Sequence, residues 1–501
     1  MTRSMKYDVV IIGSGLGGLV SAYILSKNGM KVAVFEKHLV PGGCLQSFTR
    51  SGVSFETGMH YIGSMKEGEA LYRYFKYLGL SDSLPLSKMD ENAYETFSFG
   101  GERFTFANGH ERFVENLAGS FPDEVDALKN YVDMCASVTA SSPMYSFGDH
   151  NNIALLNPDH VLRSVSETVD SITDNPLLRN LFVGINPLYG GVKDVTPLYI
   201  HALIWDFYNK GAYRTVGGSD KIASLLCESI KKMGGEIFTG AEVTAINSFD
   251  GVASSVTVKG IGEVFCDYVI SDIHPSLVLD LVGEHTFRKV YRDRVASQKQ
   301  TVSNFSIYMK FKPERVPYLN SNFYHYGDDV WNCADYDSST WPKNFLFMHQ
   351  CSSENQKYAT HAIVFAYMNW ADVEKWADTK VGRRGEDYLE FKQICTEKLM
   401  DALESEFPGI RGDIDTFWTS SPLTYRDYTG TAEGSMYGIV HDKKNLNLTT
   451  ISQRTKVRNL FLTGQNINSH GVLGVTIGAV LACSELLGFD YLVTQIKNES
   501  K

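Results

Sequence analysis

The sequence predicts a doubly wound α/β domain with a second, α+β domain interleaved in it. Three observations predict this fold class. A strand, a glycine-rich turn, a helix and a second strand follow one another within residues 7–36. Related patterns recur near residues 213 and 459. The segments between these units have different patterns: the first is mostly helical and rich in aromatic residues, and the second mixes strand-like runs with a charged helix. A domain that leaves and re-enters the chain places its partner over its ligand site.

The first unit reads as a nucleotide-binding strand–turn–helix. Residues 7–12 are apolar and β-branched enough to form a buried parallel strand, and the turn after them satisfies G-x-G-x-x-G. Residues 16–27 predict a helix, and residues 31–35 a second strand that ends at Glu36. Glycines let the backbone approach a pyrophosphate whose charge meets the helix N-terminus, and Glu36 can accept hydrogen bonds from an adenosine ribose. An ordinary βαβ turn is the alternative. The residues expected at the nucleotide are Gly13, Ser14, Gly15, Leu16, Gly17, Gly18, Glu36 and Lys37.

Two later units complete the predicted FAD/NAD(P)-binding, Rossmann-like domain. In the second, a glycine pair precedes a helical pattern at 220–233, strands at 236–238 and 242–247, and a hairpin at 252–270. In the third, a strand at 459–463 leads through a glycine-rich loop at 464–474 into a helix that ends near residue 487. The predicted nucleotide domain therefore comprises 1–75, 212–288 and 455–501, and the substrate domain comprises 76–211, mostly helical, and 289–454, with mixed strands and helices.

Composition and charge narrow the class of protein. The chain has 501 residues, 43% hydrophobic and 21% charged, which is ordinary for a globular protein. A net charge of −11 argues against nucleic acid as a partner. There is no signal-peptide pattern and no apolar run of roughly 20 residues, and eight scattered cysteines without C-x-x-C suggest free thiols in a reducing cytoplasm. The histidines lack ligand spacing, so no metal site is expected. The 27 Tyr and 28 Phe suit a cavity for a long apolar ligand.

A second glycine pair favours a flavin over a nicotinamide as the resident cofactor. Gly42 and Gly43 follow Glu36 closely and would let the backbone approach the diphosphate again, as extended FAD requires. No second G-x-G-x-x-G is present, so a permanent NAD(P)H domain is not expected. Electrons for a reduction would come from NAD(P)H that docks transiently, or from another donor.

Four patches, at 12–19, 55–63, 201–218 and 460–479, carry a family resemblance that spans most of the chain. They resemble the phytoene desaturase branch of FAD-dependent oxidoreductases, and within it the all-trans-retinol 13,14-reductases (retinol saturases) and carotenoid isomerases. Gly58-Met59-His60-Tyr61 and Gly464-Gln465-Asn466 favour the retinol saturase side. Desaturases and isomerases usually carry an acidic residue where this chain has Gln465.

The resemblance implies positions for the rest of FAD and a reaction. It places Gly42 and Gly43 near the diphosphate, Val243 at adenine, and Gly464, Gln465, Gly474 and Val475 by the ribityl chain and isoalloxazine. The implied activity is saturation of one C=C bond in a conjugated isoprenoid or related lipid. Reduced-flavin carotenoid cis–trans isomerisation and desaturation are the alternatives. A non-catalytic prenyl-lipid carrier, as in Rab GDP dissociation inhibitors, is a more distant one. A lipid substrate also implies peripheral membrane contact, through apolar residues around 197–208 or within 76–150.

Saturation of a C=C bond requires a proton donor beside the flavin. His60 and Tyr61, in the loop expected beneath the flavin, are the leading candidates, followed by Glu56 and by His470 on the opposite loop. His60 has an alternative role in orienting FAD, and Glu56 one as a local cap or ion-pair partner. His201, on an apolar helix, is expected to be a hydrogen-bonded core histidine.

Overall fold

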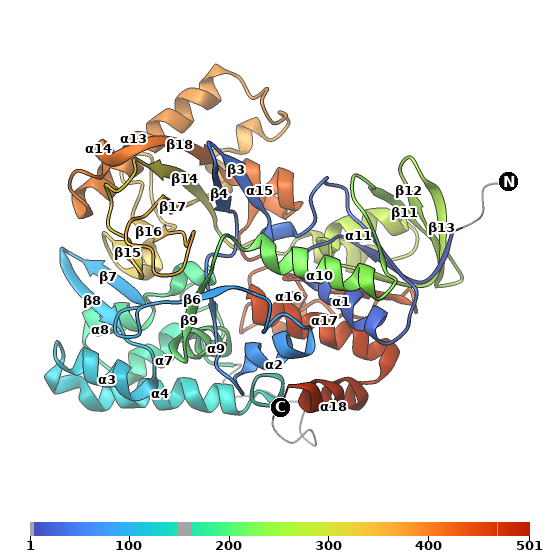
Figure 1. Cartoon of the computed structure of the whole chain (residues 1–501), viewed down its shortest axis with the longest axis horizontal. Helices are drawn as coiled ribbons and strands as arrows, with labels where there is room; N and C mark the ends of the chain where they lie inside the picture. Colours follow the sequence, from blue (N-terminus) through green and yellow to red (C-terminus); the bar gives the residue numbers. More distant parts are fainter. Residues whose placement is uncertain (1–4, 148–161, 468, 501) are drawn as a thin grey trace.

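The computed structural model describes residues 5–147, 162–467 and 469–500. Figure 1 shows a mainly parallel sheet with its hairpin on one side of the molecule, a second sheet at the opposite upper corner, and a group of helices below that second sheet. The predicted α/β class is confirmed.

Three separated parts of the chain build the first sheet. Five strands run parallel in the order β10-β2-β1-β13-β19, and β13 continues into an antiparallel extension with β12 and β11. The strands are β1 (Lys6–Ile12), β2 (Val32–Phe35), β10 (Glu236–Phe238), β11 (Val243–Phe249), β12 (Val252–Val258), β13 (Gly262–Ser271) and β19 (Leu460–Leu462). The strands β2 and β19 and residues 9–12 of β1 are apolar and buried because both faces of the sheet are covered there.

Helices from the two ends of the chain pack together beside this sheet. Leu19 and Ala479, for example, belong to one buried apolar cluster, and the Cys483 thiol lies 3.7 Å from the carbonyl oxygen of Ser21. The helices around the sheet are α1 (Leu16–Lys27), α2 (Ala70–Tyr77), α10 (Asp220–Lys232), α11 (Pro275–Val282), α12 (Lys289–Ala296), α17 (Gly471–Leu487) and α18 (Phe489–Glu499). The helix α17 begins at Gly471, earlier than the residue 475 that the sequence indicated.

Both intervening segments contribute to the second sheet. Its order is β18-β14-β17-β16-β15-β7-β8, and all neighbours are antiparallel except β15 and β7. The strands are β7 (Glu95–Phe99), β8 (Glu102–Phe106), β14 (Ser303–Phe311), β15 (Asn322–Tyr326), β16 (Asn344–His349), β17 (His361–Met368) and β18 (Ile414–Ser420). The helices of the later segment are α13 (Glu386–Glu406), α14 (Ile410–Asp413), α15 (Pro422–Thr429) and α16 (Leu446–Thr449).

The β7–β8 hairpin lies within residues 76–211, a segment whose other elements are mainly helices, and the sequence analysis did not identify it. Gly100 and Gly101 both have positive φ, at 58° and 88°, which a two-residue hairpin turn with the twist of its strands requires. Phenylalanines alternate with polar residues on either side of this pair. Two small sheets add further strands near the first segment. They consist of β3 (Ser47–Arg50) with β4 (Val53–Glu56), and of β5 (Ile62–Gly63), β9 (Ala212–Thr215) and β6 (Leu86–Lys88).

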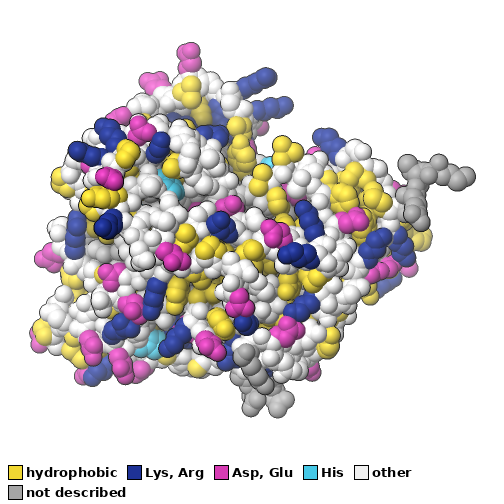
Figure 2. Space-filling model, viewed as in Figure 1, with side chains coloured by type: hydrophobic (Ala, Val, Ile, Leu, Met, Phe, Trp, Pro, Cys, Tyr) yellow, Lys and Arg dark blue, Asp and Glu magenta, His cyan; other side chains and the backbone are white. Residues whose placement is uncertain are grey.

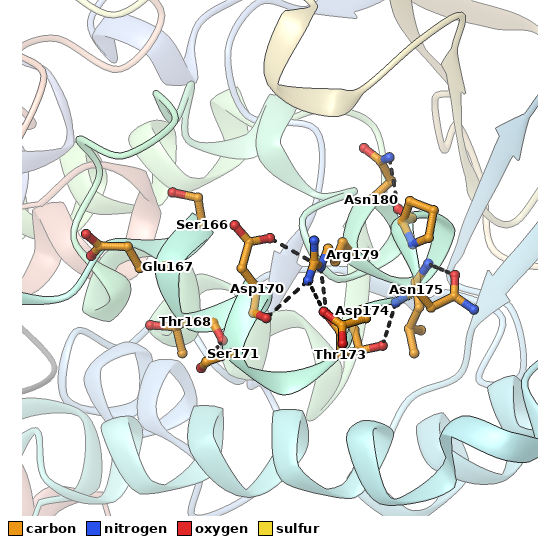
Figure 3. Close-up of polar contacts among 12 residues, drawn as sticks. Ser166, Glu167, Thr168, Asp170, Ser171, Thr173, Asp174, Asn175, Arg179 and Asn180 are labelled. Atoms are coloured by element: carbon orange, nitrogen blue, oxygen red, sulfur yellow. Dashed lines mark hydrogen bonds and ion pairs between the residues drawn. The ribbon is translucent and has the colours of Figure 1, made fainter.

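Short helices form the remaining layer, and local capping fixes their ends. Ser164 and Glu167 form a reciprocal capping box at the start of α7, and the Asn175 side chain accepts hydrogen bonds from two backbone N–H groups of α8. Figure 3 shows Arg179 of α8 directed at Asp170 and Asp174, 3.3 and 2.9 Å away, so this ion-paired corner joins the two helices. The helices of this layer are α3 (His110–Ala118), α4 (Val125–Ala140), α5 (Pro143–Ser146), α7 (Val165–Ile172), α8 (Pro176–Phe182) and α9 (Leu198–Asn209).

The helix α9 is buried, which corrects the expectation that residues 197–208 form an entrance at the surface. Ala202 and Trp205 are fully buried in its middle. His201 is the satisfied core histidine that the sequence predicted: it bonds the hydroxyls of Tyr131 and Tyr189 at 2.7 and 3.0 Å, and burial lowers its pKa to about 3. The other expected entrance, 76–150, includes residues 148–150, which lie outside the described residues.

Acidic and basic side chains are interspersed on the face shown in Figure 2, with apolar side chains among them. Among the helices that the structure describes, none combines the length and the apolar character needed to cross a bilayer.

Candidate active site

One cavity of about 470 Å³ joins the three units of the nucleotide domain to the second sheet. The sequence-predicted residues on its wall are Gly13, Ser14, Gly15, Leu16, Gly17, Glu36, Lys37, Gly42, Gly43, His60, Tyr61, Val243, Gly464, Gln465 and Val475. Gly18, Gly474, Glu56 and His470 lie away from this wall. The structure therefore brings most of the expected site together from segments far apart in the chain.

The glycine turn is packed so closely that larger residues do not fit. Gly13 has a φ of +92°, and a Cβ atom at Gly18 would lie 2.2 Å from the carbonyl oxygen of Gly13. A Cβ atom at Gly43 would lie 3.0 Å from the Cα atom of Gly15, so the second glycine pair rests directly on the first turn. Gly18 thus acts through close helix–strand packing, while Gly13, Gly15 and Gly43 leave backbone open to the cavity.

Glu36 ends β2 with a carboxylate held in a fixed position. Its Oε2 atom accepts hydrogen bonds from the backbone N–H and the hydroxyl of Ser14, at 3.0 and 2.7 Å, and Oε1 accepts one from the His38 N–H at 2.8 Å. A carboxylate offers about four acceptor positions, so one remains for a ribose hydroxyl. The side chain is 6% exposed and lies on the cavity wall.

The carboxy-terminal loop closes the same cavity from the opposite side. Gly464 has a φ of +96°, and a Cβ atom at Gly17 would lie 3.1 Å from the Gly464 nitrogen. A Cβ atom at Gly474 would lie 2.8 Å from the Ser469 side chain, so Gly474 allows the loop to fold tightly onto α17. Gln465 and Val475 reach the cavity beside this loop.

Asp272, just beyond β13, is a site residue that the sequence analysis did not identify. Its carboxylate oxygens lie 2.5 Å from the position of a Cβ atom at Gly15 or Gly17, and 2.6 Å from that of one at Gly464. Burial is the main cause that raises the pKa of Asp272 to about 7, with a smaller contribution from Glu36. A carboxyl group thus lies on the cavity wall between the two loops that would hold a diphosphate. The sequence signal for Asp272 was its position directly after a predicted strand, because that strand ends beside the glycine turn.

The two leading proton-donor candidates both reach the cavity but differ in their surroundings. The Nδ1 atom of His60 has no hydrogen-bond partner among the described residues, and it lies 3.6 Å from Glu56 Oε2, too far for a hydrogen bond. The Tyr61 hydroxyl donates to Glu95 Oε1 across 2.6 Å, and the Tyr61 ring stacks on Tyr208 with 4.2 Å between ring centroids. Tyr61 is therefore held in one orientation from two directions.

The other two proton-donor candidates are engaged with neighbouring protein groups. Glu56 is buried and accepts a hydrogen bond from Gln350 Nε2 at 3.1 Å. His470 is the N-cap residue of α17 and packs against the ring of Tyr437 at 5.0 Å between centroids. Burial is the larger cause that lowers the pKa of His470 to about 3, and His441 adds to it, so the imidazole is neutral at neutral pH.

The part of the cavity beyond the glycine turns is largely apolar. Strands β16 and β17 and the helix α9 supply its wall, and these elements belong to the predicted substrate domain. The side chains there are Leu188, Tyr208, Leu346, Met348, Phe365, Met436 and Tyr437. A ligand that extended from the glycine cradle into this chamber would meet aromatic and aliphatic surface.

The cavity suits an elongated dinucleotide with a planar ring at its inner end. Glycine backbone, a helix N-terminus and the Glu36 carboxylate match an adenosine diphosphate, and the loop around Gly464 lies where the second half of such a molecule would reach. These features fit the flavin that the sequence implies. Six of the lining residues on the first segment are predicted glycine or acidic positions, namely Gly13, Gly15, Gly17, Glu36, Gly42 and Gly43.

Comparison with known proteins agrees with this geometry. The family model described as flavin containing amine oxidoreductase matches residues 16–487. All-trans-retinol 13,14-reductase of Rattus norvegicus is 28% identical over 96% of this chain and 86% of its own length, and prolycopene isomerase 2 of an Oncidium hybrid cultivar is 23% identical over 97% of this chain and 85% of its own length. The crystal structure of an oxidoreductase from Methanosarcina mazei has the same fold, with a TM-score of 0.64 at 18% identity over 95% of this chain and 99% of its own. The chain therefore belongs to the flavin-containing amine oxidoreductase family, whose members are flavin-dependent oxidoreductases.

Proposed function

We propose that this protein binds FAD and saturates one C=C bond of a long conjugated isoprenoid, as its relatives named all-trans-retinol 13,14-reductase do with retinol. The observation that carries the proposal is that the glycine cradle for FAD and an apolar chamber belong to the same cavity. An apolar chamber favours a polyene over an amine, because a charged amine would lose its hydration there without an ion partner.

Several separate elements of the cavity wall would hold FAD. Gly13, Gly15 and Glu36 would hold the adenosine diphosphate, with Gly43 completing the approach to the diphosphate. Val243 would contact adenine, and Gly464 with Gln465 would lie along the ribityl chain and the ring system. When bound and reduced, the flavin supplies the electron pair and one of the two hydrogens that a C=C bond takes up.

The protein supplies orientation, exclusion of water and the second hydrogen. The chamber walls hold the polyene against the flavin face, and alignment of this kind is a large part of catalysis. Tyr61 is the proposed proton donor because it lies on the cavity wall and its position is fixed by Glu95 and Tyr208. His60, with an unpartnered Nδ1 atom, is proposed to orient the flavin or the substrate.

The electron donor and the cellular location belong to the same proposal. The flavin would be reduced by NAD(P)H docking transiently at the open side of the cavity. The protein would act in the cytoplasm and contact membranes peripherally to collect its substrate. Stopped-flow reduction by NADH and NADPH, and flotation with liposomes, test these two points.

The product distinguishes the proposed function from its alternatives. FAD-loaded protein, reduced with dithionite under anaerobic conditions, is incubated with all-trans-retinol, other retinoids and linear carotenes. Saturation gives a product two mass units heavier than the substrate, with a shortened polyene absorption and reoxidised flavin. An unchanged spectrum and mass across all these substrates would contradict the proposal.

Carotenoid cis–trans isomerisation is the second candidate, because prolycopene isomerases match almost the whole chain. An isomerase would return a product of unchanged mass and leave the flavin reduced. Desaturation, by contrast, would remove two mass units and would require oxidised flavin at the start. A purified protein that retains lipid but binds no flavin would favour a non-catalytic carrier.

A further inference from the structure

A second layer of polar side chains lies directly behind Tyr61, away from the cavity. Glu95, the first residue of β7, is completely buried there, and its Oε1 atom accepts the 2.6 Å hydrogen bond from the Tyr61 hydroxyl. Its Oε2 atom has no hydrogen-bond partner among the described residues. The Tyr324 hydroxyl lies 3.4 Å from that of Tyr61. A fully buried carboxyl group with an unpaired oxygen is costly unless it is neutral or has a function.

The surroundings of Glu95 keep it protonated at neutral pH. Burial dominates and raises the pKa of Glu95 to about 8, although hydrogen bonds and the nearby Arg214 oppose the shift. Among the described residues, Arg214 forms no ion pair with Glu95; its Nη2 atom donates to Ser321 O and Asn322 Oδ1, both at 3.0 Å. The carboxyl group therefore carries a proton while it touches the proposed proton donor.

The groups that face Glu95 leave it as the one that titrates near neutral pH. Arg214 of β9 presents a guanidinium group, and Asn322 of β15 does not titrate. The phenols around Glu95 have pKa values raised well beyond their ordinary range, mainly by burial, and they stay neutral; they are Tyr61, Tyr94, Tyr208, Tyr324 and Tyr326. Among the described groups that face it, Glu95 is thus the strongest acid that still holds its proton at pH 7.

We propose that Glu95 is the proton reservoir of this enzyme, which reloads Tyr61 as Tyr61 protonates the substrate. The inference rests on the proposed function, and Glu95 acts through Tyr61 without touching the substrate. This proposal gives the buried Glu95 carboxyl group a role in the reaction.

The sequence of bond changes is balanced. The Tyr61 O–H bond breaks as a C–H bond forms on one alkene carbon, while the electron pair and the other hydrogen come from the reduced flavin of the proposed function. The phenolate oxygen of Tyr61, which is then an acceptor, takes the proton of the Glu95 carboxyl group across the contact that the Tyr61 hydroxyl makes with Oε1. Glu95 is the stronger acid of the two, so this transfer is favourable and no phenolate persists in the apolar cavity. The Glu95 carboxylate regains a proton from water once the product leaves.

Glu95→Gln tests the role because it keeps the size and an acceptor oxygen for Tyr61 but has no proton of comparable acidity. The assay is single-turnover reoxidation of the reduced, FAD-loaded enzyme by the polyene, followed by flavin absorption between pH 6 and pH 10. In the wild type, the rate should fall about tenfold per pH unit above about pH 8, because Glu95 loses its proton there. In Glu95→Gln, the rate should be at least about 100-fold lower at pH 7, the usual loss on removing a general acid, and this fall above pH 8 should be absent.

Two further variants separate proton supply from structure. Glu69→Gln is the matched control: burial also raises the pKa of Glu69, but its carboxylate accepts from the Lys66 N–H at the start of α2. It should leave both the rate and the pH profile unchanged. Tyr61→Phe should lower the rate at every pH, since the reservoir then has no route to the substrate. Flavin content and melting temperature are measured for each variant, to identify any that misfold.

An infrared measurement tests Glu95 independently of turnover. The oxidised, FAD-loaded wild type should show the C=O band of a protonated carboxylic acid that disappears on titration through about pH 8 and is missing in Glu95→Gln. If the wild type reduces no polyene but shows this band, the proposed function fails while the protonation of Glu95 stands. A band that is absent at pH 7, or a fall above pH 8 that persists in Glu95→Gln, overturns the inference.

Discussion

Asp272→Asn should remove a pH dependence of FAD binding. In the wild type, the Asp272 carboxyl group lies between the glycine turn and the loop at Gly464, where the FAD diphosphate would approach. A neutral carboxyl group can donate a hydrogen bond to that diphosphate, whereas a carboxylate would repel it. Tight binding therefore requires the protonated form of Asp272.

The magnitude follows from the pKa of Asp272, which is raised to about 7 in the protein without cofactor. Because a raised pKa leaves the group neutral below this value, the affinity for FAD should be constant below about pH 6. Above about pH 7, protonation costs about 1.4 kcal/mol for each pH unit, so the dissociation constant should rise about tenfold per unit. Asp272→Asn is neutral at every pH and should keep the tight binding of the wild type at low pH.

The assay is fluorescence titration of the apoprotein with FAD between pH 5.5 and pH 9. Asp280→Asn is the control, since Asp280 lies on the wall of the same cavity but is exposed and ion-paired with Arg292 at 3.3 Å. It should retain the slope of the wild type. A flat profile in the wild type, or an unchanged slope in Asp272→Asn, would refute the reasoning.

Three further substitutions test other parts of the cavity. Gly18→Ala places a methyl group 2.2 Å from the Gly13 carbonyl oxygen. It should lower the free energy of unfolding by about 1–3 kcal/mol, measured by thermal unfolding, and reduce flavin retention, measured by visible absorption. Unchanged values would contradict the packing argument. Glu36→Gln removes a charge-assisted hydrogen-bond acceptor, so FAD binding should weaken on the order of tenfold in the same fluorescence titration. Equal affinity would show that the ribose of FAD does not bind this carboxylate. Leu346→Phe narrows the apolar chamber, so the KM for polyenes should rise severalfold while the flavin absorption spectrum stays constant. An unchanged KM would show that the substrate binds elsewhere.

Much of the nucleotide domain could be predicted from the sequence because its signals are local. Helix α1 has the predicted bounds, since the glycine turn sets its start and Gly29 follows its end. The hairpin of β12 and β13 was also predicted, because two apolar runs flank a short turn. The β7–β8 hairpin was missed although Gly100-Gly101 marks its turn, because the helical periodicity around it dominated the interpretation of residues 76–211.

The residues behind the site could not be predicted in the same way. Glu95 meets Tyr61 from 34 positions away in the chain, through a pairing of β7 with β15 that no local pattern encodes. Asp272 comes close to Gly17 and Gly464 only when three separated segments form one sheet. The sequence identified the chemical types needed at the cofactor, whereas the partners that tune their acidity depend on tertiary contacts.

The contact between the glycine turn near Gly17 and the loop at Gly464 has a consequence for biosynthesis. A ribosome makes the amino-terminal half of the flavin pocket early and the closing half only after residue 460 has been translated. The nascent chain thus carries an incomplete pocket through most of its synthesis. The complete pocket can therefore enclose its cofactor only after the loop at Gly464 has been translated.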